Sequence, residues 1–77
     1  MAALYFERRT DTEWTAHQPD GTLAGLLRFN EQFYDWQAYV VAKIDAPIPY
    51  FDLIGAFPDK SLGCHEIVWR WSTAWRP

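Results

Sequence analysis

The chain of 77 residues has a formal net charge of −3, and 49% of its residues are hydrophobic. A chain this short is expected to form a single domain over residues 1–77, and its apolar content is too high for intrinsic disorder. The acidic balance argues against a protein that coats nucleic acid, which needs clustered lysine and arginine. No apolar run approaches the ~20 residues of a membrane span, so no membrane partner is expected.

Cysteine usage bears on both stability and location. Cys64 is the only cysteine, so no internal disulfide can form, and a single thiol suits a reducing, cytoplasmic location. The first residues lack the charged and apolar regions of a signal peptide, so none is expected. A small fold without disulfides needs a rich core or self-association, and five Trp, five Phe and four Tyr are expected to supply the core.

The first half of the chain alternates apolar and polar side chains, which is the period of a β-strand. A strong turn signal interrupts it at Pro19-Asp20-Gly21, because proline fixes φ at the first turn position and glycine accepts the positive φ that follows. A second tight reversal is expected at Asn30-Glu31. The predicted strands cover residues 4–9, 13–17 and 23–29.

The longest alternating run covers residues 34–43 and predicts a further strand of an antiparallel meander. The rival interpretation is a helix over residues 31–44, because Phe33, Trp36 and Val40 also recur at helical spacing. The aromatic and β-branched content favours the strand. Residues 45–57 are expected to be irregular and to fold back over one end of the core, since this segment holds two prolines, Pro47 and Pro49.

The last segment predicts a helix that begins after Asp59 as its N-cap. A final strand is the alternative, because tryptophans also alternate there, but the length without a turn signal favours the helix. Projection at 100° per residue places an apolar stripe on one side, made of Cys64, Ile67, Val68, Trp71 and Trp75, with Gly63 and Ala74 at its edge. The predicted fold class is therefore α+β, with an antiparallel sheet of three to four strands and one C-terminal helix packed on a face.

Catalytic and metal-binding patterns are weak. His17, Cys64 and His65 do not have the paired spacing of a structural zinc site, so no metal is expected. Cys64 with His17 is the one conceivable nucleophile and base, yet Cys64 falls on the predicted core stripe. Asp35 is the one aspartate predicted inside a strand. Because no glycine-rich phosphate loop is present, neither a cofactor nor enzymatic activity is expected.

Arginines beside an aromatic residue are the ingredients of a single-strand nucleic-acid platform. Arg8 and Arg9 are adjacent, Tyr5 precedes them on the same predicted strand, and Arg28 lies on the third predicted strand. The acidic composition of the whole chain argues against this function, and the arginines are predicted to be ordinary surface residues.

The face of the predicted helix opposite its apolar stripe holds Trp69, which has no core role there. An apolar centre with a polar rim is the composition of an interface hot spot. The alternative is that residues 45–57 or a chain terminus cover the indole. A second candidate contact surface is the solvent face of the long strand, with Tyr39 and Val41, and with Leu26 exposed beside them. The predicted partner-binding residues are Trp69, Leu62, His65, Thr73, Arg76 and Tyr39.

The layout resembles small proteins carried by phages and mobile elements, among which are the anti-CRISPR inhibitors. The shared format is a short hairpin with the turn at Pro19-Asp20-Gly21, a strand bearing Trp36, and a Leu-Ile-Gly-Ala-Phe-Pro lead-in at residues 53–58 to a final helix. The resemblance implies an inhibitor that covers a site on a host protein, such as a component of a defence complex.

Three classes of function follow, in order of preference. The first is a non-enzymatic protein-binding module whose partner is another protein. The second is a homodimer with a structural or accessory role, in which the surplus aromatics serve self-association. The third is a small enzyme or ligand-binding domain that uses Asp35 or His17 in a pocket beside the sheet.

Overall fold

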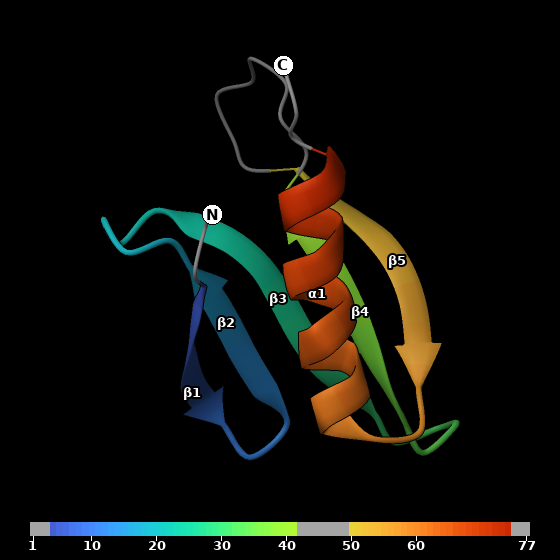
Figure 1. Cartoon of the computed structure of the whole chain (residues 1–77). Helices are drawn as coiled ribbons and strands as arrows, with labels where there is room; N and C mark the ends of the chain where they lie inside the picture. The colour runs from blue at the N-terminus through green and yellow to red at the C-terminus, as the bar shows by residue number, and fades with distance from the viewer. Residues whose placement is uncertain (1–3, 42–49, 75–77) are drawn as a thin grey trace.

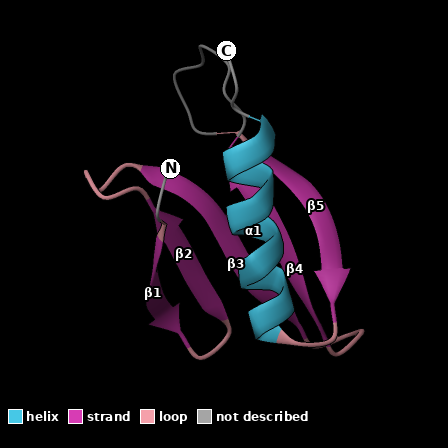
Figure 2. Ribbon diagram, viewed as in Figure 1, coloured by secondary structure: helices cyan, strands magenta, loops and turns pink. Residues whose placement is uncertain are grey.

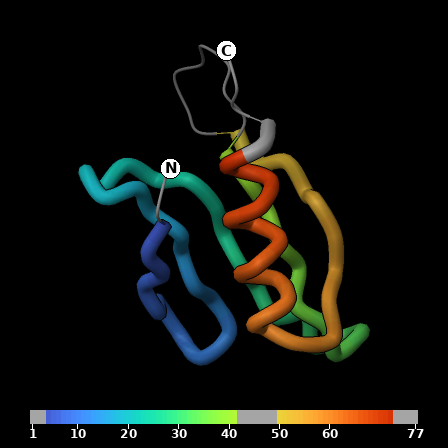
Figure 3. Tube along the Cα trace, in the orientation of Figure 1, coloured from blue at the N-terminus to red at the C-terminus, as the bar shows by residue number. Residues whose placement is uncertain are grey.

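The computed structural model describes residues 4–41 and 50–74. In these residues an antiparallel meander, with strand order β1-β2-β3-β4-β5, is followed by one helix (Figure 1). The elements are β1 (Tyr5–Thr10), β2 (Glu13–His17), β3 (Leu23–Asn30), β4 (Asp35–Val41), β5 (Phe51–Phe57) and α1 (Lys60–Ala74). The trace reverses direction after each strand, and α1 runs back antiparallel to β5 (Figure 3).

The α+β class and the antiparallel sheet with a C-terminal helix are confirmed, but the expectation of three to four strands is wrong. The described residues form five strands, and the additional one is β5, which lies in the segment expected to be irregular. Pro47 and Pro49 lie outside the described residues, and β5 itself has no proline. The strand sits at the edge of the sheet, where flanking prolines are tolerated.

A bulge in β5 explains why its sequence does not alternate cleanly. Gly55 pairs with Ala38, whereas the next pair is Leu53 with Tyr39, so Ile54 is the extra residue on β5. Ile54 packs against the core. A strand with an extra residue shifts the side chains beyond it to the other face, and this shift conceals the two-residue period.

The strand interpretation of the long alternating run is confirmed, and the rival helix is wrong. β4 is shorter than the predicted strand at its start, because residues 31–34 form a turn rather than a tight two-residue reversal. Trp36, Ala38 and Val40 face the core, as their alternation predicts. The end of the predicted strand, residues 42–43, lies outside the described residues.

The C-terminal helix is also confirmed against the alternative of a final strand. Asp59 caps it, since its Oδ1 accepts hydrogen bonds from the Ser61 backbone N–H and the Ser61 hydroxyl, both at 2.9 Å. α1 lies across one face of the sheet, in front of β3 and β4 and beside β5 (Figure 2). The opposite face of the sheet carries no helix among the described elements.

The centre of the core is made of small and aliphatic side chains rather than of the aromatics expected there. Ala16, Leu27, Ala38 and Ile67 are fully buried between α1 and the sheet. A Cβ on Gly25 would lie 2.7 Å from the Tyr39 carbonyl oxygen and 2.9 Å from the Ile67 side chain, so helix and sheet approach too closely there for a larger residue. Half-buried residues surround this centre: Leu4, Phe6, Trp14, Trp36, Val40, Ile54, Phe57 and Cys64.

Candidate functional site

Apolar side chains lie on two opposite sides of α1. Ile67 and Trp71 are buried against the sheet, as the predicted stripe requires. On the other side, Leu62 is 50% exposed and Trp69 is 55% exposed, and His65 is exposed between them. At 100° per residue these three side chains fall within one narrow stripe. We call Leu62, His65 and Trp69 the outer stripe.

Charged side chains border the outer stripe. Glu66 and Arg70 form an ion pair along the helix, with Arg70 Nε 3.5 Å from Glu66 Oε1. A pair at this spacing is mostly solvent-screened and contributes little to stability. An apolar centre with a polar, charged border is nevertheless the arrangement found at protein interfaces. The predicted outward direction of Trp69 is therefore confirmed, while its role in binding stays a prediction.

The remaining predicted partner-binding residues do not join the outer stripe. The side chain of Thr73 and the whole of Arg76 lie outside the described residues. Tyr39 lies on the sheet face away from α1, because its neighbour Ala38 points into the core. Its hydroxyl donates to Gln37 Oε1 at 2.9 Å, and its ring meets Phe51 edge-on at 6.5 Å.

The second predicted contact surface is less open than expected. Leu26 is buried rather than exposed, and Tyr39 and Val41 are half-buried. Leu26 lies between Thr15 of β2 and Tyr39 of β4, and for Tyr39 the physical reason is the fifth strand. β5 adds Phe51 beside Tyr39, and this contact removes part of the expected surface from solvent.

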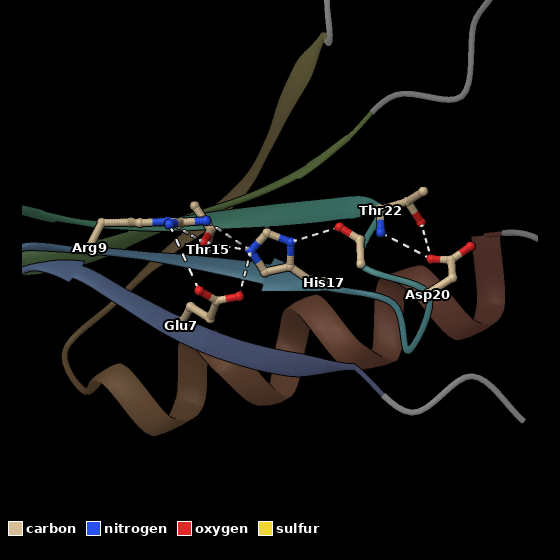
Figure 4. Close-up of polar contacts among 7 residues, drawn as sticks. Glu7, Arg9, Thr15, His17, Asp20 and Thr22 are labelled. Carbon is tan, nitrogen blue, oxygen red and sulfur yellow. Dashed lines mark hydrogen bonds and ion pairs between the residues drawn. The ribbon is translucent and has the colours of Figure 1, made fainter.

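A buried histidine on the sheet face away from α1 organises a polar network that the sequence did not reveal (Figure 4). His17 Nδ1 lies 3.3 Å from the Gly21 carbonyl oxygen, and Nε2 lies 2.8 Å from the Thr15 hydroxyl. A carbonyl only accepts, so Nδ1 carries a proton in its bond to Gly21. Both ring nitrogens of His17 are therefore occupied by polar neighbours.

Strand β1 covers this histidine with charged and aromatic side chains. Arg9 Nε donates to the Thr15 hydroxyl at 3.0 Å, and its guanidinium lies 3.8 Å from Glu7. Glu7 Oε1 is 3.9 Å from His17 Nε2, and the Tyr5 ring stacks on the imidazole at 5.4 Å. The register of β1 shifts between Arg8 and Thr10, which leaves Arg9 unpaired with β2. A bulge is a tertiary feature, so no pattern in the sequence placed Arg9 in this network.

The candidate catalytic residues are separated in space. Cys64 packs against the core from α1, whereas His17 lies on the opposite face of the sheet. Burial raises the pKa of the Cys64 thiol, which keeps the sulfur protonated and weakly nucleophilic. Asp35 pairs with the last residue of β3, and His17 pairs with the first, so the two lie about 23 Å apart along the strand at ~3.3 Å per residue.

The arginines that were considered as a basic platform lie beside carboxylates. Arg8 pairs with Asp11, and Arg28 Nε lies 3.3 Å from Glu13 Oε2. Arg9 lies beside Glu7, as described above. The guanidinium groups of Arg8, Arg9 and Arg28 therefore each have an acidic neighbour.

A comparison with protein-family models, with curated proteins and with solved structures finds no match to this chain. In the part of the chain that the structure describes, no three His, Cys, Asp or Glu side chains gather in a way that would hold a metal ion. α1, the helix of that same part, is too short and too polar to cross a membrane.

Proposed function

We propose that this protein is a non-enzymatic protein-binding module that places the outer stripe of α1 in an apolar groove of another protein. The observation that carries the proposal is the half-exposure of both Leu62 and Trp69 on the side of the helix opposite its core side. Amphipathic helices bind grooves through anchors three, four and seven residues apart, and the spacing of Leu62, His65 and Trp69 fits this mode.

The energetics of the outer stripe suit such an interface. Trp69 is 55% exposed, so roughly half of its large apolar surface remains to be removed from water. Burial of that half would contribute about 2–3 kcal/mol to binding, at ~25 cal/mol per Å². Tryptophan is also the residue type most enriched at energetic hot spots.

The partner is expected to be electropositive, since this chain has a net charge of −3. The resemblance to anti-CRISPR inhibitors supports a specific class of partner, a component of a host defence complex that works on nucleic acid. Proteins that bind nucleic acid present basic surfaces. An acidic module that covers such a surface would act as an inhibitor by excluding the nucleic acid.

The test is a binding titration against purified components of a host defence complex, with the wild-type chain and two single variants. Trp69→Ala should weaken binding by roughly 30- to 150-fold, which corresponds to about 2–3 kcal/mol. Tyr50→Ala is the matched control, because Tyr50 is 59% exposed and lies outside α1. The proposal fails if no component binds, or if Trp69→Ala binds as well as Tyr50→Ala.

A second copy of this chain is the alternative occupant of the outer stripe. It is favoured by the small core, in which Leu27 and Ile67 are the largest fully buried side chains of the described residues. Light scattering over a range of protein concentrations separates the two proposals. A dimer that Trp69→Ala converts to a monomer supports self-association, whereas a wild-type chain that stays monomeric at high concentration removes it.

A further inference from the structure

The turn between β3 and β4, residues 31–34, has an unusual backbone at its last position. Tyr34 has φ = 53°, which is the left-handed region. A side chain with a Cβ is unfavourable there, and glycine or asparagine is the ordinary occupant of such a turn position. Tyr34 is the one non-glycine residue with positive φ among the residues that the structure covers.

The same turn exposes its two aromatic side chains. Tyr34 is 79% exposed and Phe33 is 68% exposed, the highest values for large apolar residues in the described ranges 4–41 and 50–74. The Tyr34 ring meets Phe29 edge-on at 6.0 Å, and this contact removes little of it from solvent. The turn therefore keeps a residue that neither suits its backbone nor buries its ring.

A second unfavourable feature lies at the next residue. Asp35 Oδ1 is buried and accepts no hydrogen bond within the described part of the protein. A buried acceptor without a donor lowers stability. Unfavourable local features that persist in a fold are typical of sites under functional constraint, because stability alone would remove them.

The charges of this turn indicate what it would contact. Glu31 is its charged residue, Asp35 follows it as the first residue of β4, and no basic residue lies between Asn30 and Asp35. The ion pairs among the described residues involve other carboxylates, those of Glu7, Asp11, Glu13 and Glu66. Phe33 and Tyr34 thus lie beside the exposed carboxylate of Glu31, which forms no ion pair among the described residues.

We infer that the β3–β4 turn is a separate binding element, in which Phe33 and Tyr34 enter an apolar socket rimmed by lysine or arginine on a partner protein. The basic rim complements the exposed Glu31 carboxylate. The same negative charge disfavours an anionic lipid surface or nucleic acid as the occupant. The inference rests on the proposed function in one respect, since it takes the partner to be a protein.

The arrangement of the chain allows this turn and the outer stripe to engage one partner. β3 ends and α1 begins at the same end of the molecule, at the bottom of Figure 1. Leu62 stands in the first turns of α1, so the outer stripe starts at that end. Two separated anchors on one partner would raise affinity and restrict the orientation of binding.

The experiment uses the full chain with a photo-crosslinking phenylalanine analogue in place of Phe33, and a matched protein with the analogue in place of Tyr50. Crosslinking is carried out in cells that produce the protein, and mass spectrometry identifies the adduct and the peptide attached. The expected result is an adduct specific to position 33 that maps to a partner segment containing lysine or arginine. An adduct with lipid, an adduct with a second copy of this chain, or no adduct specific to position 33 overturns the inference.

The captured protein is then purified and titrated with the wild type, Tyr34→Gly, Phe33→Ser and Tyr50→Ser. Both turn variants should weaken binding at least tenfold, and Tyr50→Ser should not. The melting temperature of Tyr34→Gly should rise, which separates lost contact from lost folding; a fall in this temperature, or unchanged affinity, counts against the inference.

Trp69→Ala in the same titration distinguishes the two proposals. If Trp69→Ala loses binding and the turn variants keep it, the proposed function stands and the turn proposal is refuted. If the turn variants lose binding and Trp69→Ala keeps it, the turn proposal stands and the role of the outer stripe is refuted.

Discussion

Two turns of the same sheet differ in how well their residues suit their backbones. In the turn between β2 and β3, the positive φ of 92° falls on Gly21, where it costs little. Asp20 Oδ1 accepts from the Thr22 backbone N–H at 3.0 Å and from its hydroxyl at 2.7 Å. The Gly21 N–H donates to the Gln18 carbonyl at 2.8 Å, and His17 reaches the Gly21 carbonyl from the buried network.

In the turn between β3 and β4, the positive φ falls on Tyr34 instead. One side-chain hydrogen bond supports the turn, from the Gln32 N–H to Asn30 Oδ1 at 2.9 Å. Its aromatic rings are exposed, and Asp35 Oδ1 is buried without a donor in the described structure. The comparison teaches that the first turn is built for stability, whereas the second keeps features that stability does not explain. This contrast has measurable consequences for the free energy of unfolding.

His17→Leu should have the largest effect, because the imidazole joins the first turn to two strands. Its loss removes the hydrogen bonds to the Thr15 hydroxyl and the Gly21 carbonyl in a partly buried site, which lowers the free energy of unfolding by about 2 kcal/mol. Urea denaturation measures the change. His65→Leu is the control, since His65 is exposed on α1 and should change stability by less than about 0.5 kcal/mol. Equal effects of the two substitutions would contradict the anchoring role of His17.

Gly21→Ala should come next. A Cβ at φ = 92° is strained whatever the space around it, so the free energy of unfolding should fall by about 1–2 kcal/mol. Thermal unfolding followed by circular dichroism is a sufficient measurement. An unchanged melting temperature would show that this turn relaxes easily and that the contrast between the turns is weaker than the geometry indicates.

Tyr34→Gly should have the opposite sign. Relief of the left-handed strain exceeds the added chain entropy of glycine and the lost edge contact with Phe29, for a net gain of about 0.5 kcal/mol. Phe33→Gly is the matched control, because Phe33 does not have a positive φ and gains nothing from glycine. A loss of stability in Tyr34→Gly similar to that in Phe33→Gly would refute the strained character of the second turn.

Asp20→Asn should have the smallest effect and should depend on pH. Hydrogen bonds from the Thr22 side chain and backbone lower the pKa of the Asp20 carboxyl below its ordinary 3.8. A carboxyl whose pKa is lower in the folded state than in the unfolded state stabilises the fold at pH values above the unfolded-state pKa. This stabilisation is lost as the pH falls through the folded-state pKa. Wild type should therefore be slightly more stable than Asp20→Asn at pH 7, and this difference should shrink as the pH falls below 3.8. If the difference in stability between wild type and Asp20→Asn does not change with pH, the charge of the Asp20 carboxylate is not its cause.

Features that depend on neighbours along the chain were predictable from the sequence. The two-residue period predicted β1 to β4, and Pro19-Asp20-Gly21 predicted the turn between β2 and β3 correctly. Asp59 was identified as the cap of α1, and the helical period predicted which side chains would be inward and which outward. Each of these depends on the backbone preference of single residues, or on contacts within about one helical or strand period.

Tertiary structure alone decided the features that join distant segments. β5 exists as a strand because β4 offers it a pairing edge and a bulge absorbs Ile54. The His17 network needs β1, β2 and the following turn together, and the bulge at Arg9 completes it. Tyr39 and Trp69 were expected to be candidate contact residues, and the packing of α1 on one sheet face puts them on different sides of the molecule. Pairing edges, bulges and the choice of covered face come from contacts between residues far apart in the sequence, which no local period encodes.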